Sequence, residues 1–220
     1  LMQAGADINT KDAEGNPPLL IAAAQHRASV CKFLVQAGAD LDMVTGDGDT
    51  ALLLATAGGM EEVVLALLSG KANPNVQNAQ GHTALLLAAA KGLEPIHTAL
   101  LEAGADPSVR NKGQSTALIL AASGGHTNAC AKLLAHKADV TAANCYQSTP
   151  LILAAQNGHA PLVPLLLAAG ADPNCRNRDE DTPLHMAAGR GLEEGCRQLL
   201  AAGANVDAKN ANAYTATILA

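Results

Sequence analysis

The chain has 220 residues, 49% of them hydrophobic and 1% aromatic, and a formal net charge of −6 at pH 7. The charge is uneven, because residues 1–109 carry −7 and residues 110–220 carry +1. An acidic to neutral chain with almost no stacking rings argues against a nucleic-acid partner, and no apolar run reaches the ~18 residues that a membrane span needs.

The hydrophobic residues are mostly Ala and Leu, and the aromatic residues are Phe33, Tyr146 and Tyr214. A globular core normally uses large rings to fill its volume, whereas a core of Ala and Leu fits thin helices that pack closely. Five cysteines without a Cys-x-x-Cys pair, together with no secretory signal and no glycosylation sequon, predict an intracellular location. We expect the cytoplasm, with the nucleus as the alternative.

A six-residue segment returns every 33 residues along the chain. Its first copy is Pro17-Pro-Leu-Leu-Ile-Ala, and the later copies begin at Thr50, Thr83, Thr116, Thr149, Thr182 and Thr215. A second marker, Gly or Lys followed by Ala, keeps the same step at residues 5, 38, 71, 104, 137, 170 and 203. No insertion or deletion interrupts this register, so each repeat is expected to form the same structural unit.

The sequence of each repeat predicts two short helices followed by a turn-rich loop. Thr is a good N-cap and Pro suits the first helical position, so the repeated segment starts the first helix. Glycines stop this helix at positions 59, 92, 125, 158 and 191. A second helix, such as the stretch from Pro161 to Ala169, ends at the Gly/Lys-Ala marker. Helices of about two turns are unstable alone, so neighbouring repeats must bury one another's apolar faces.

This pattern resembles the ankyrin-repeat family, which has a period of 33 residues and the signature Thr-Pro-Leu-His-x-Ala. The nearest match begins at Thr182, and the resemblance covers the whole chain. It implies an all-α fold, an ankyrin-repeat solenoid of stacked helix-turn-helix units with protruding β-turn fingers. We expect a single domain over residues 1–220, with partial repeats at 1–10 and 209–220. The expected full repeats are 11–43, 44–76, 77–109, 110–142, 143–175 and 176–208.

Several residues depart from the family pattern. Lys71 and Lys137 stand where glycine ends the second helix, and a left-handed backbone there costs each of them roughly 1 kcal/mol. Pro164 lies inside a second helix and is expected to perturb it. The loop glycine becomes Gln or Glu in three later fingers, which we expect to alter those turns. These three residues are Gln114, Gln147 and Glu180.

No motif predicts catalysis, a metal or a cofactor. Asp47-Gly-Asp49 resembles the start of a calcium loop but lacks the Glu that such a loop needs at its end. Gly189-Arg-Gly191 follows a helix rather than a strand, which weakens it as a phosphate loop. Cysteine shares one repeat position with Val and with His97, and exchange with Val indicates a buried apolar slot. We expect His97 to be a hydrogen-bonded or partly exposed core histidine.

By this resemblance, partners bind the finger tips and the first-helix face, which line the concave side of the solenoid. The groove is acidic in the early repeats and basic in the later ones, and Tyr146 falls near arginines of adjacent repeats. Tyr and Arg are enriched among interface hot spots, so we expect the main contact in repeats five and six, with a protein that presents an acidic surface. The expected partner-binding residues are Tyr146, Gln156, Asn157, Arg176, Arg178, Asp181, Arg190 and Tyr214.

We therefore expect a non-catalytic protein-interaction module or scaffold that acts as a monomer without a cofactor. A second interpretation is a docking or regulatory ankyrin segment of a larger enzyme, receptor or channel, because the repeats at both ends are incomplete. A free-standing enzyme is disfavoured, since polar residues change identity between repeats whereas an active site needs one convergent cluster.

Overall fold

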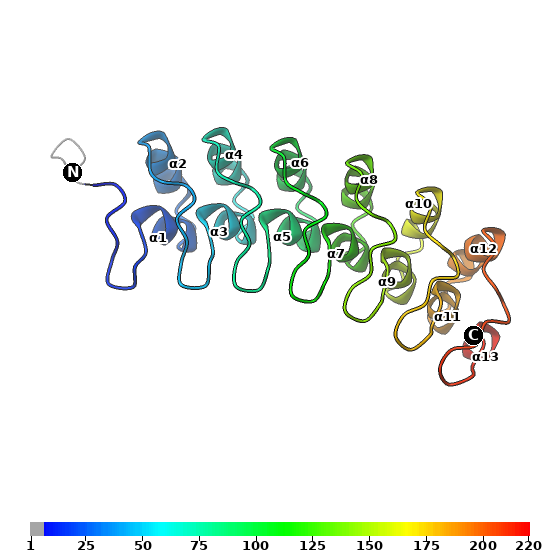
Figure 1. The fold of residues 1–220 in the computed structure, drawn as a ribbon. Helices are drawn as coiled ribbons and strands as arrows, with labels where there is room; N and C mark the ends of the chain where they lie inside the picture. Colours follow the sequence, from blue (N-terminus) through cyan, green and yellow to red (C-terminus); the bar gives the residue numbers. More distant parts are fainter. Residues whose placement is uncertain (1–6) are drawn as a thin grey trace. The chain divides into compact units, whose positions relative to one another are not determined.

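The computed structural model describes residues 7–220, so residues 1–6 of the expected first partial repeat lie outside the described residues. The described residues fall into two compact units, each of which we treat by itself. Unit 1 comprises residues 7–88 and 93–106, and unit 2 comprises residues 89–92 and 107–220. Both units are built from pairs of short helices (Figure 1). The single domain and the repeat bounds given above stay predictions.

The helices alternate between a first and a second helix of each pair. The first helices are α1 (Pro18–Ala24), α3 (Ala51–Ala57), α5 (Ala84–Lys91), α7 (Ala117–Gly124), α9 (Pro150–Gln156), α11 (Pro183–Gly189) and α13 (Ala216–Leu219). The second helices are α2 (Ala28–Gln36), α4 (Glu61–Ser69), α6 (Glu94–Glu102), α8 (Thr127–Ala135), α10 (Leu162–Ala168) and α12 (Glu193–Ala201).

The repeated Thr caps the first helix, as its position predicts, except at Thr215, whose side chain makes no cap to α13. In α3 the Thr50 hydroxyl accepts a hydrogen bond from the Leu53 N–H at 3.2 Å, and in α9 Thr149 accepts from Ile152 at 3.3 Å. The same bond recurs at Thr83, Thr116 and Thr182. A side-chain cap of this kind contributes about 1 kcal/mol, because it satisfies an N–H that has no partner within the helix.

The glycines that follow the first helices take the left-handed backbone that the sequence predicts. Their φ angles are 65° at Gly59, 66° at Gly92 and Gly191, 75° at Gly125 and 88° at Gly158. Lys71 and Lys137 also adopt this conformation at the end of their second helices, with φ of 68° and 63°. The predicted departure from the glycine pattern is therefore confirmed.

Pro164 shortens the helix that contains it. The other second helices begin at the equivalents of residue 160, but α10 begins at Leu162. Proline lacks an N–H, and its ring would clash with the carbonyl of Ala160, so the regular first turn cannot form. Val163 instead donates to the Ala160 carbonyl at 3.2 Å, three residues back. The predicted perturbation is confirmed, and it is confined to the start of α10.

Small side chains form the core between the helices. In unit 1, α1 packs against α2 and α3, and α4 packs against α2 and α6; in unit 2, α9 packs against α7, α10 and α11. Paired alanines such as Ala121 and Ala122 are completely buried, which lets first helices approach closely. Buried leucines such as Leu118 and Leu151 fill the layer between first and second helices, each contributing roughly 1.5–3 kcal/mol.

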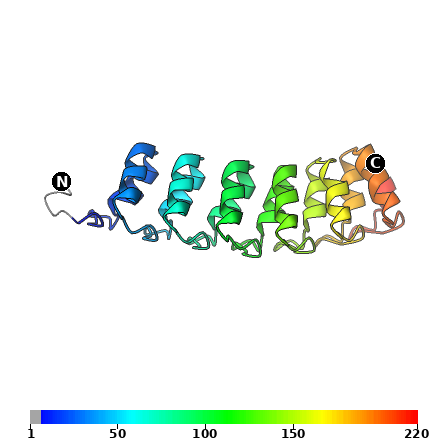
Figure 2. The ribbon, with the colours of Figure 1, turned by 90° about the horizontal axis from the view of Figure 1, so that it is seen from above.

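The loops form short hairpin fingers on one side of the helices in each unit (Figure 2). In the finger of residues 143–149, Gln147 donates to the Asn144 carbonyl at 2.9 Å and Asn144 donates to the Ser148 carbonyl at 3.1 Å. Gln147 has a φ of 58°, which matches a type I turn followed by a left-handed residue. Gly48 and Gly81 make the same bond in their own fingers.

The expectation that Gln114, Gln147 and Glu180 alter the turns is therefore wrong. All three take φ between 58° and 60° and keep the hydrogen bonds of the glycine fingers. The reason is an asparagine at the start of the loop: the Asn144 side-chain oxygen accepts from the N–H groups of Tyr146 at 2.9 Å and Ser148 at 3.0 Å. This side chain holds the loop in shape whether or not glycine is present.

The shared position of cysteine, valine and histidine in the second helices is buried in the first five of them, whereas Cys196 in α12 is only half-buried. Cys31 and Cys130 are completely buried, and burial raises the pKa of Cys130 to about 12. His97 is also completely buried, so the alternative of a partly exposed ring is wrong. Across residues 7–220, no group of three His, Cys, Asp or Glu side chains could hold a metal ion. Over the same residues, no helix combines the length and the apolar character that crossing a membrane requires.

Candidate partner-binding face

The N–H groups in the finger of residues 143–149 are engaged within the protein from Asn144 to Ser148. From Asn144 to Ser148, each successive N–H has an acceptor, either inside the finger or on the preceding finger. Cys145 donates to the Gly113 carbonyl at 3.0 Å, and Arg178 donates to the Tyr146 carbonyl at 2.9 Å, so adjacent fingers are tied together. A partner therefore meets side chains here rather than an open strand edge.

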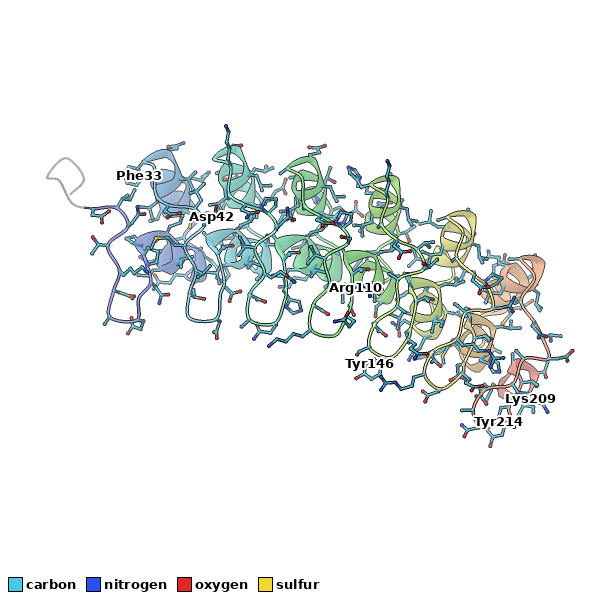
Figure 3. All side chains as sticks on the ribbon, in the orientation of Figure 1. Phe33, Asp42, Arg110, Tyr146, Lys209 and Tyr214 are labelled. Carbon is cyan, nitrogen blue, oxygen red and sulfur yellow. The ribbon has the colours of Figure 1, made fainter. Side chains whose placement is uncertain are left out.

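Tyr146 stands at the tip of its finger, with 63% of its surface exposed (Figure 3). The Arg178 guanidinium, from the next finger, lies over its ring at 5.9 Å from the centroid. The same guanidinium donates through Nη2 to the Cys145 carbonyl at 2.6 Å. A cation over an exposed ring contributes about 0.5–1 kcal/mol, so this pair holds the aromatic side chain in a defined place.

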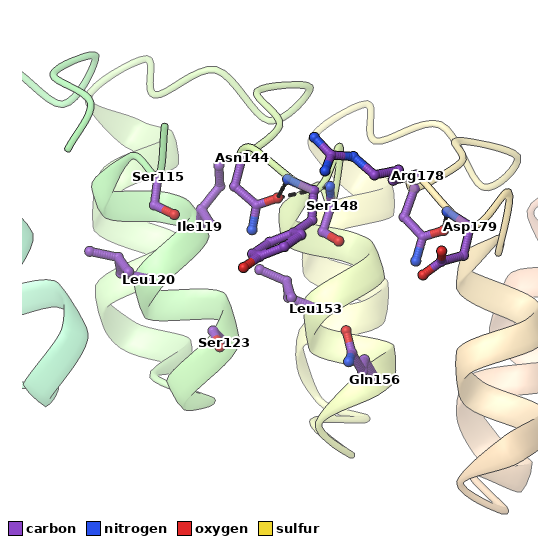
Figure 4. A pocket seen from close by; sticks show the side chains of 12 residues that line it. Ser115, Ile119, Leu120, Ser123, Asn144, Ser148, Leu153, Gln156, Arg178 and Asp179 are labelled. Carbon is purple, nitrogen blue, oxygen red and sulfur yellow. Dashed lines mark hydrogen bonds between the residues drawn. The ribbon is translucent and has the colours of Figure 1, made fainter. Parts of the chain in front are cut away.

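Tyr146 and Arg178 line a cleft of about 610 Å³ in unit 2. Figure 4 shows Arg178 on the finger side of this cleft. Its opposite wall comes from α7 and α9, where Leu120 and Leu153 are only half-buried. We call it the Tyr146 cleft. Hydroxyl and amide groups complete the lining. The remaining lining residues are Ser115, Ile119, Ser123, Asn144, Ser148, Gln156, Asn177 and Asp179.

A second cleft, of about 430 Å³, adjoins the first at Gln156, which lines both. We call it the Tyr214 cleft. Tyr214, 47% exposed, lines it together with Arg190 and Asp181. Asp181 already accepts a hydrogen bond from the Asn210 side chain at 2.7 Å, so its carboxylate is partly committed to the fold.

Six of the eight expected binding residues thus line the two clefts, and the other two are held elsewhere. Asn157 donates to the Ser123 carbonyl at 2.9 Å. Arg176 donates to the Lys209 carbonyl at 2.8 Å and forms an ion pair with Glu180 at 3.1 Å. Because that pair is exposed, it contributes little stability, but the backbone bond fixes Arg176 to the next finger.

Sequence reasoning did not identify the inner wall of the Tyr146 cleft. Leu120 and Leu153 belong to the apolar stripe of the first helices, and that stripe alone indicates a core position. Their position in the repeat could have indicated that they line a cleft, because both lie four residues after the capping Thr, on the helix beside the finger. Sequence also grouped Arg176 with Arg178, although the two guanidinium groups bind carbonyls of different fingers.

His185 links the last two fingers of unit 2. Its Nδ1 lies 2.7 Å from the Thr182 hydroxyl and its Nε2 lies 2.9 Å from the Tyr214 carbonyl. A carbonyl can only accept, so Nε2 carries the proton and Nδ1 accepts from Thr182. The signature histidine therefore ties the loop to the capping Thr at this position.

Comparison with known proteins shows to which family the chain is similar. The family model described as ankyrin repeats (3 copies) matches residues 1–78, 22–111, 67–144, 85–177 and 151–220. The human ASB11 ankyrin repeat domain is similar, with 30% sequence identity and a TM-score of 0.82 over 93% of this chain and 92% of that one. The ankyrin repeat domain of Bcl-3, described as a unique member of the IkappaB protein family, is similar too. It shares 32% identity and a TM-score of 0.79 over 94% of this chain and 95% of that one.

A search of curated proteins found no match. The overlapping family matches nevertheless run from the first residue to the last, and the solved structures share the arrangement of stacked helix pairs. The predicted all-α ankyrin fold is confirmed. Such domains are generally protein-interaction modules and are typically non-catalytic. The chain belongs to the ankyrin-repeat family.

Proposed function

We propose that this chain is a non-catalytic interaction module or scaffold that binds a partner protein on the finger face of unit 2. The finger face comprises the fingers and the first helices of that unit. The observation that carries the proposal is the pair of adjoining clefts that share Gln156, each lined by an exposed tyrosine and an arginine. Exposed Tyr and Arg at a concave surface are the commonest anchors of protein interfaces.

The charge distribution of unit 2 supports a partner with an acidic contact surface. On the fingers and first helices, basic residues outnumber acidic ones, whereas acidic residues predominate on the second helices and their turns. The basic residues of the finger face are Lys91, Arg110, Lys112, Arg176, Arg178, Arg190 and Lys209, and the acidic ones are Asp179, Glu180 and Asp181. A complementary acidic surface would be steered toward this face, with the association rate falling as salt rises.

Site-specific photo-crosslinking tests the proposal. A benzophenone amino acid in place of Tyr146 is expected to capture a partner from cell extract, because this tip is exposed beside the cleft. The same amino acid in place of Lys132, on the second helix α8, is the matched control. Crosslinked products are identified by mass spectrometry, and their yield is compared between the two sites.

A partner captured equally well from both sites would contradict the proposal, as would capture from Lys132 alone. A competition experiment provides a second test of the binding face. The variant with Tyr146→Ala and Arg190→Ala should compete poorly with the wild-type chain for the captured protein. The variant with Glu193→Ala and Arg197→Ala, on α12, should compete normally.

We also propose that the chain is monomeric and resides inside the cell, in the cytoplasm or nucleus. All five cysteines are free thiols, which suits a reducing compartment. Light scattering of the purified chain and imaging of the tagged parent protein test these two points.

A second proposal is that this chain serves as a docking or regulatory segment of a larger enzyme, receptor or channel. Both similar solved structures are described as the ankyrin repeat domain of a named protein, which supports it. Deleting these residues from the full-length protein should then abolish its recruitment or regulation while leaving any catalytic or channel activity measurable.

A further inference from the structure

Arg178 is a cation with unused hydrogen-bonding capacity at the mouth of the Tyr146 cleft. Guanidinium has five N–H donors. Of the interactions that it makes with residues 7–220, one hydrogen bond goes to the Cys145 carbonyl and the ring of Tyr146 lies against its face. It forms no ion pair within the described chain, although Arg176 and Arg197 do. Its remaining donors suit a carboxylate, which arginine binds in a bidentate manner.

The opposite wall of the cleft has a different chemistry. Leu120 and Leu153 present half-buried apolar surface, and the Tyr146 ring adds further apolar surface to the lining. Between the two walls lie the hydroxyls of Ser115 and Ser148, both more than nine-tenths buried. The lining thus combines apolar surface, buried serines and two opposite charges, the Arg178 guanidinium and the Asp179 carboxylate.

The engaged finger backbone restricts how a ligand can be held. Because the N–H groups of residues 144–148 are all donated within the protein, a peptide cannot add to the finger as a further strand. Recognition has to pass through side chains, and the cleft volume of about 610 Å³ suits a few residues of an extended peptide rather than a folded surface.

We propose that the Tyr146 cleft binds an extended peptide segment of the partner that carries a carboxylate next to an apolar side chain. The carboxylate pairs with Arg178, and the apolar side chain packs between Leu120, Leu153 and Tyr146. This inference rests on the proposed function and adds the chemistry of the ligand to it. Arg178 determines specificity for the acidic residue, and Tyr146 positions Arg178 while it also contributes apolar contact.

Random-peptide phage display against the purified 220-residue chain supplies the probe. Enriched sequences are synthesised with fluorescein, and their affinity is measured by fluorescence anisotropy. We expect enrichment of Asp or Glu within a few residues of Leu, Met or Phe. Arg178→Gln should weaken binding by about tenfold or more, as expected for a lost charge-assisted hydrogen bond. Arg178→Lys should lose less, because it keeps the charge.

Gln156 provides a charge test that does not disturb the Tyr146–Arg178 pair. It lines the cleft from the end of α9 and has no part in that contact. Gln156→Glu should weaken binding of an acidic peptide by about threefold and Gln156→Lys should strengthen it by about as much, with both effects shrinking at high salt. Arg197→Gln on α12 is the matched control and should leave affinity unchanged.

The outcomes separate this inference from the proposed function. Peptides without an acidic preference, or affinities indifferent to both Arg178→Gln and the charge at Gln156, overturn the inference. If those peptides still lose affinity on Arg190→Ala or Tyr214→Ala, the proposed finger-face function stands. Absence of any enriched peptide overturns the inference and leaves the proposed function to the photo-crosslinking result, whereas loss of binding only on Arg197→Gln overturns both. Circular dichroism and the urea midpoint of each variant confirm that it is folded.

Discussion

At the scale of single residues, Lys71 and Lys137 carry backbone strain. Both take the left-handed conformation with φ of 68° and 63°, where most repeats have glycine. A side chain in this conformation costs roughly 1–2 kcal/mol, and glycine recovers most of that while losing some by its greater freedom in the unfolded chain. We expect Lys71→Gly and Lys137→Gly each to raise the free energy of unfolding by about 0.5–1 kcal/mol, measured by urea denaturation.

The matched control is Lys132→Gly. Lys132 lies in the interior of α8, where the same substitution removes helix propensity and should cost about 1 kcal/mol. A destabilisation at all three lysines would contradict the strain interpretation.

The five cysteines are predicted to differ in reactivity. Burial raises the pKa of Cys130 to about 12, so at pH 8 only about one thiol in ten thousand is the reactive thiolate. Burial also raises the pKa of Cys31, Cys175 and Cys196, whereas Cys145 is exposed on its finger. We expect iodoacetamide at pH 8 to label Cys145 first and Cys130 only after unfolding, as followed by peptide mass spectrometry. Equal labelling rates at Cys130 and Cys145 would contradict the buried slot.

The His185 side chain joins two fingers through hydrogen bonds to the Thr182 hydroxyl and the Tyr214 carbonyl. Replacing it with Leu, which stands at this position in other repeats, retains apolar burial but leaves the Tyr214 carbonyl without its donor. We expect His185→Leu to cost about 1–3 kcal/mol and to speed hydrogen exchange at residues 209–214. Met186→Leu, which conserves volume one residue away, should have little effect on either quantity. Unchanged exchange in the last finger would show that the bridge is not what holds it.

At the scale of an element, α10 is shorter than its equivalents because of one proline. Pro164→Ala restores an N–H and removes the ring that conflicts with the Ala160 carbonyl, so the helix should extend to begin near residue 160. We expect a gain of about 1 kcal/mol in the free energy of unfolding, with slower hydrogen exchange at Val163. Pro95→Ala provides the control: Pro95 lies in the first turn of α6, where proline is tolerated, and its replacement should change stability by less than about 0.5 kcal/mol.

The elements themselves were largely predictable from sequence. Thr50 and its equivalents mark helix starts through a local hydrogen bond, and glycines such as Gly59 mark helix ends through a local backbone preference. The effect of Gln147 was misjudged because its strain is offset by a side-chain bond from Asn144, which requires the loop geometry to be known. The lining of the Tyr146 cleft was missed because it joins α7, α9 and two fingers, and no spacing within one repeat reveals which half-buried leucine faces which tip.

The sequence also did not predict the directions in which the Arg176 and Arg178 side chains point. Arg176 and Arg178 are two residues apart in one finger, and both are exposed. One binds the Lys209 carbonyl of the following finger and the other binds the Cys145 carbonyl of the preceding one. Both arginines thus tie adjacent fingers together, and only the three-dimensional register of the fingers shows that Arg178 also lines the Tyr146 cleft.

At the scale of the whole molecule, the pattern of contacts predicts that unfolding is local. The principal helix contacts join each helix to its own pair partner or to the same helix of an adjacent repeat. Stability in such an array is a sum of repeat terms and nearest-neighbour terms rather than the property of one shared core. Leu52→Ala in α3 and Leu118→Ala in α7 each remove a fully buried side chain and should each cost about 2–5 kcal/mol near the site of the change.

Native-state hydrogen exchange can resolve where that free energy is lost. For Leu52→Ala, protection should fall most in α1 to α4 and remain close to wild type in α9 to α12, because the lost contacts are confined to neighbours. For Leu118→Ala, the loss should centre on α7 to α10 and leave α1 and α2 nearly unchanged. A uniform loss of protection along the chain in both variants would mean that all repeats unfold as one cooperative unit. The local pattern would instead allow the fingers of unit 2 to hold a ligand while distant repeats open and close independently.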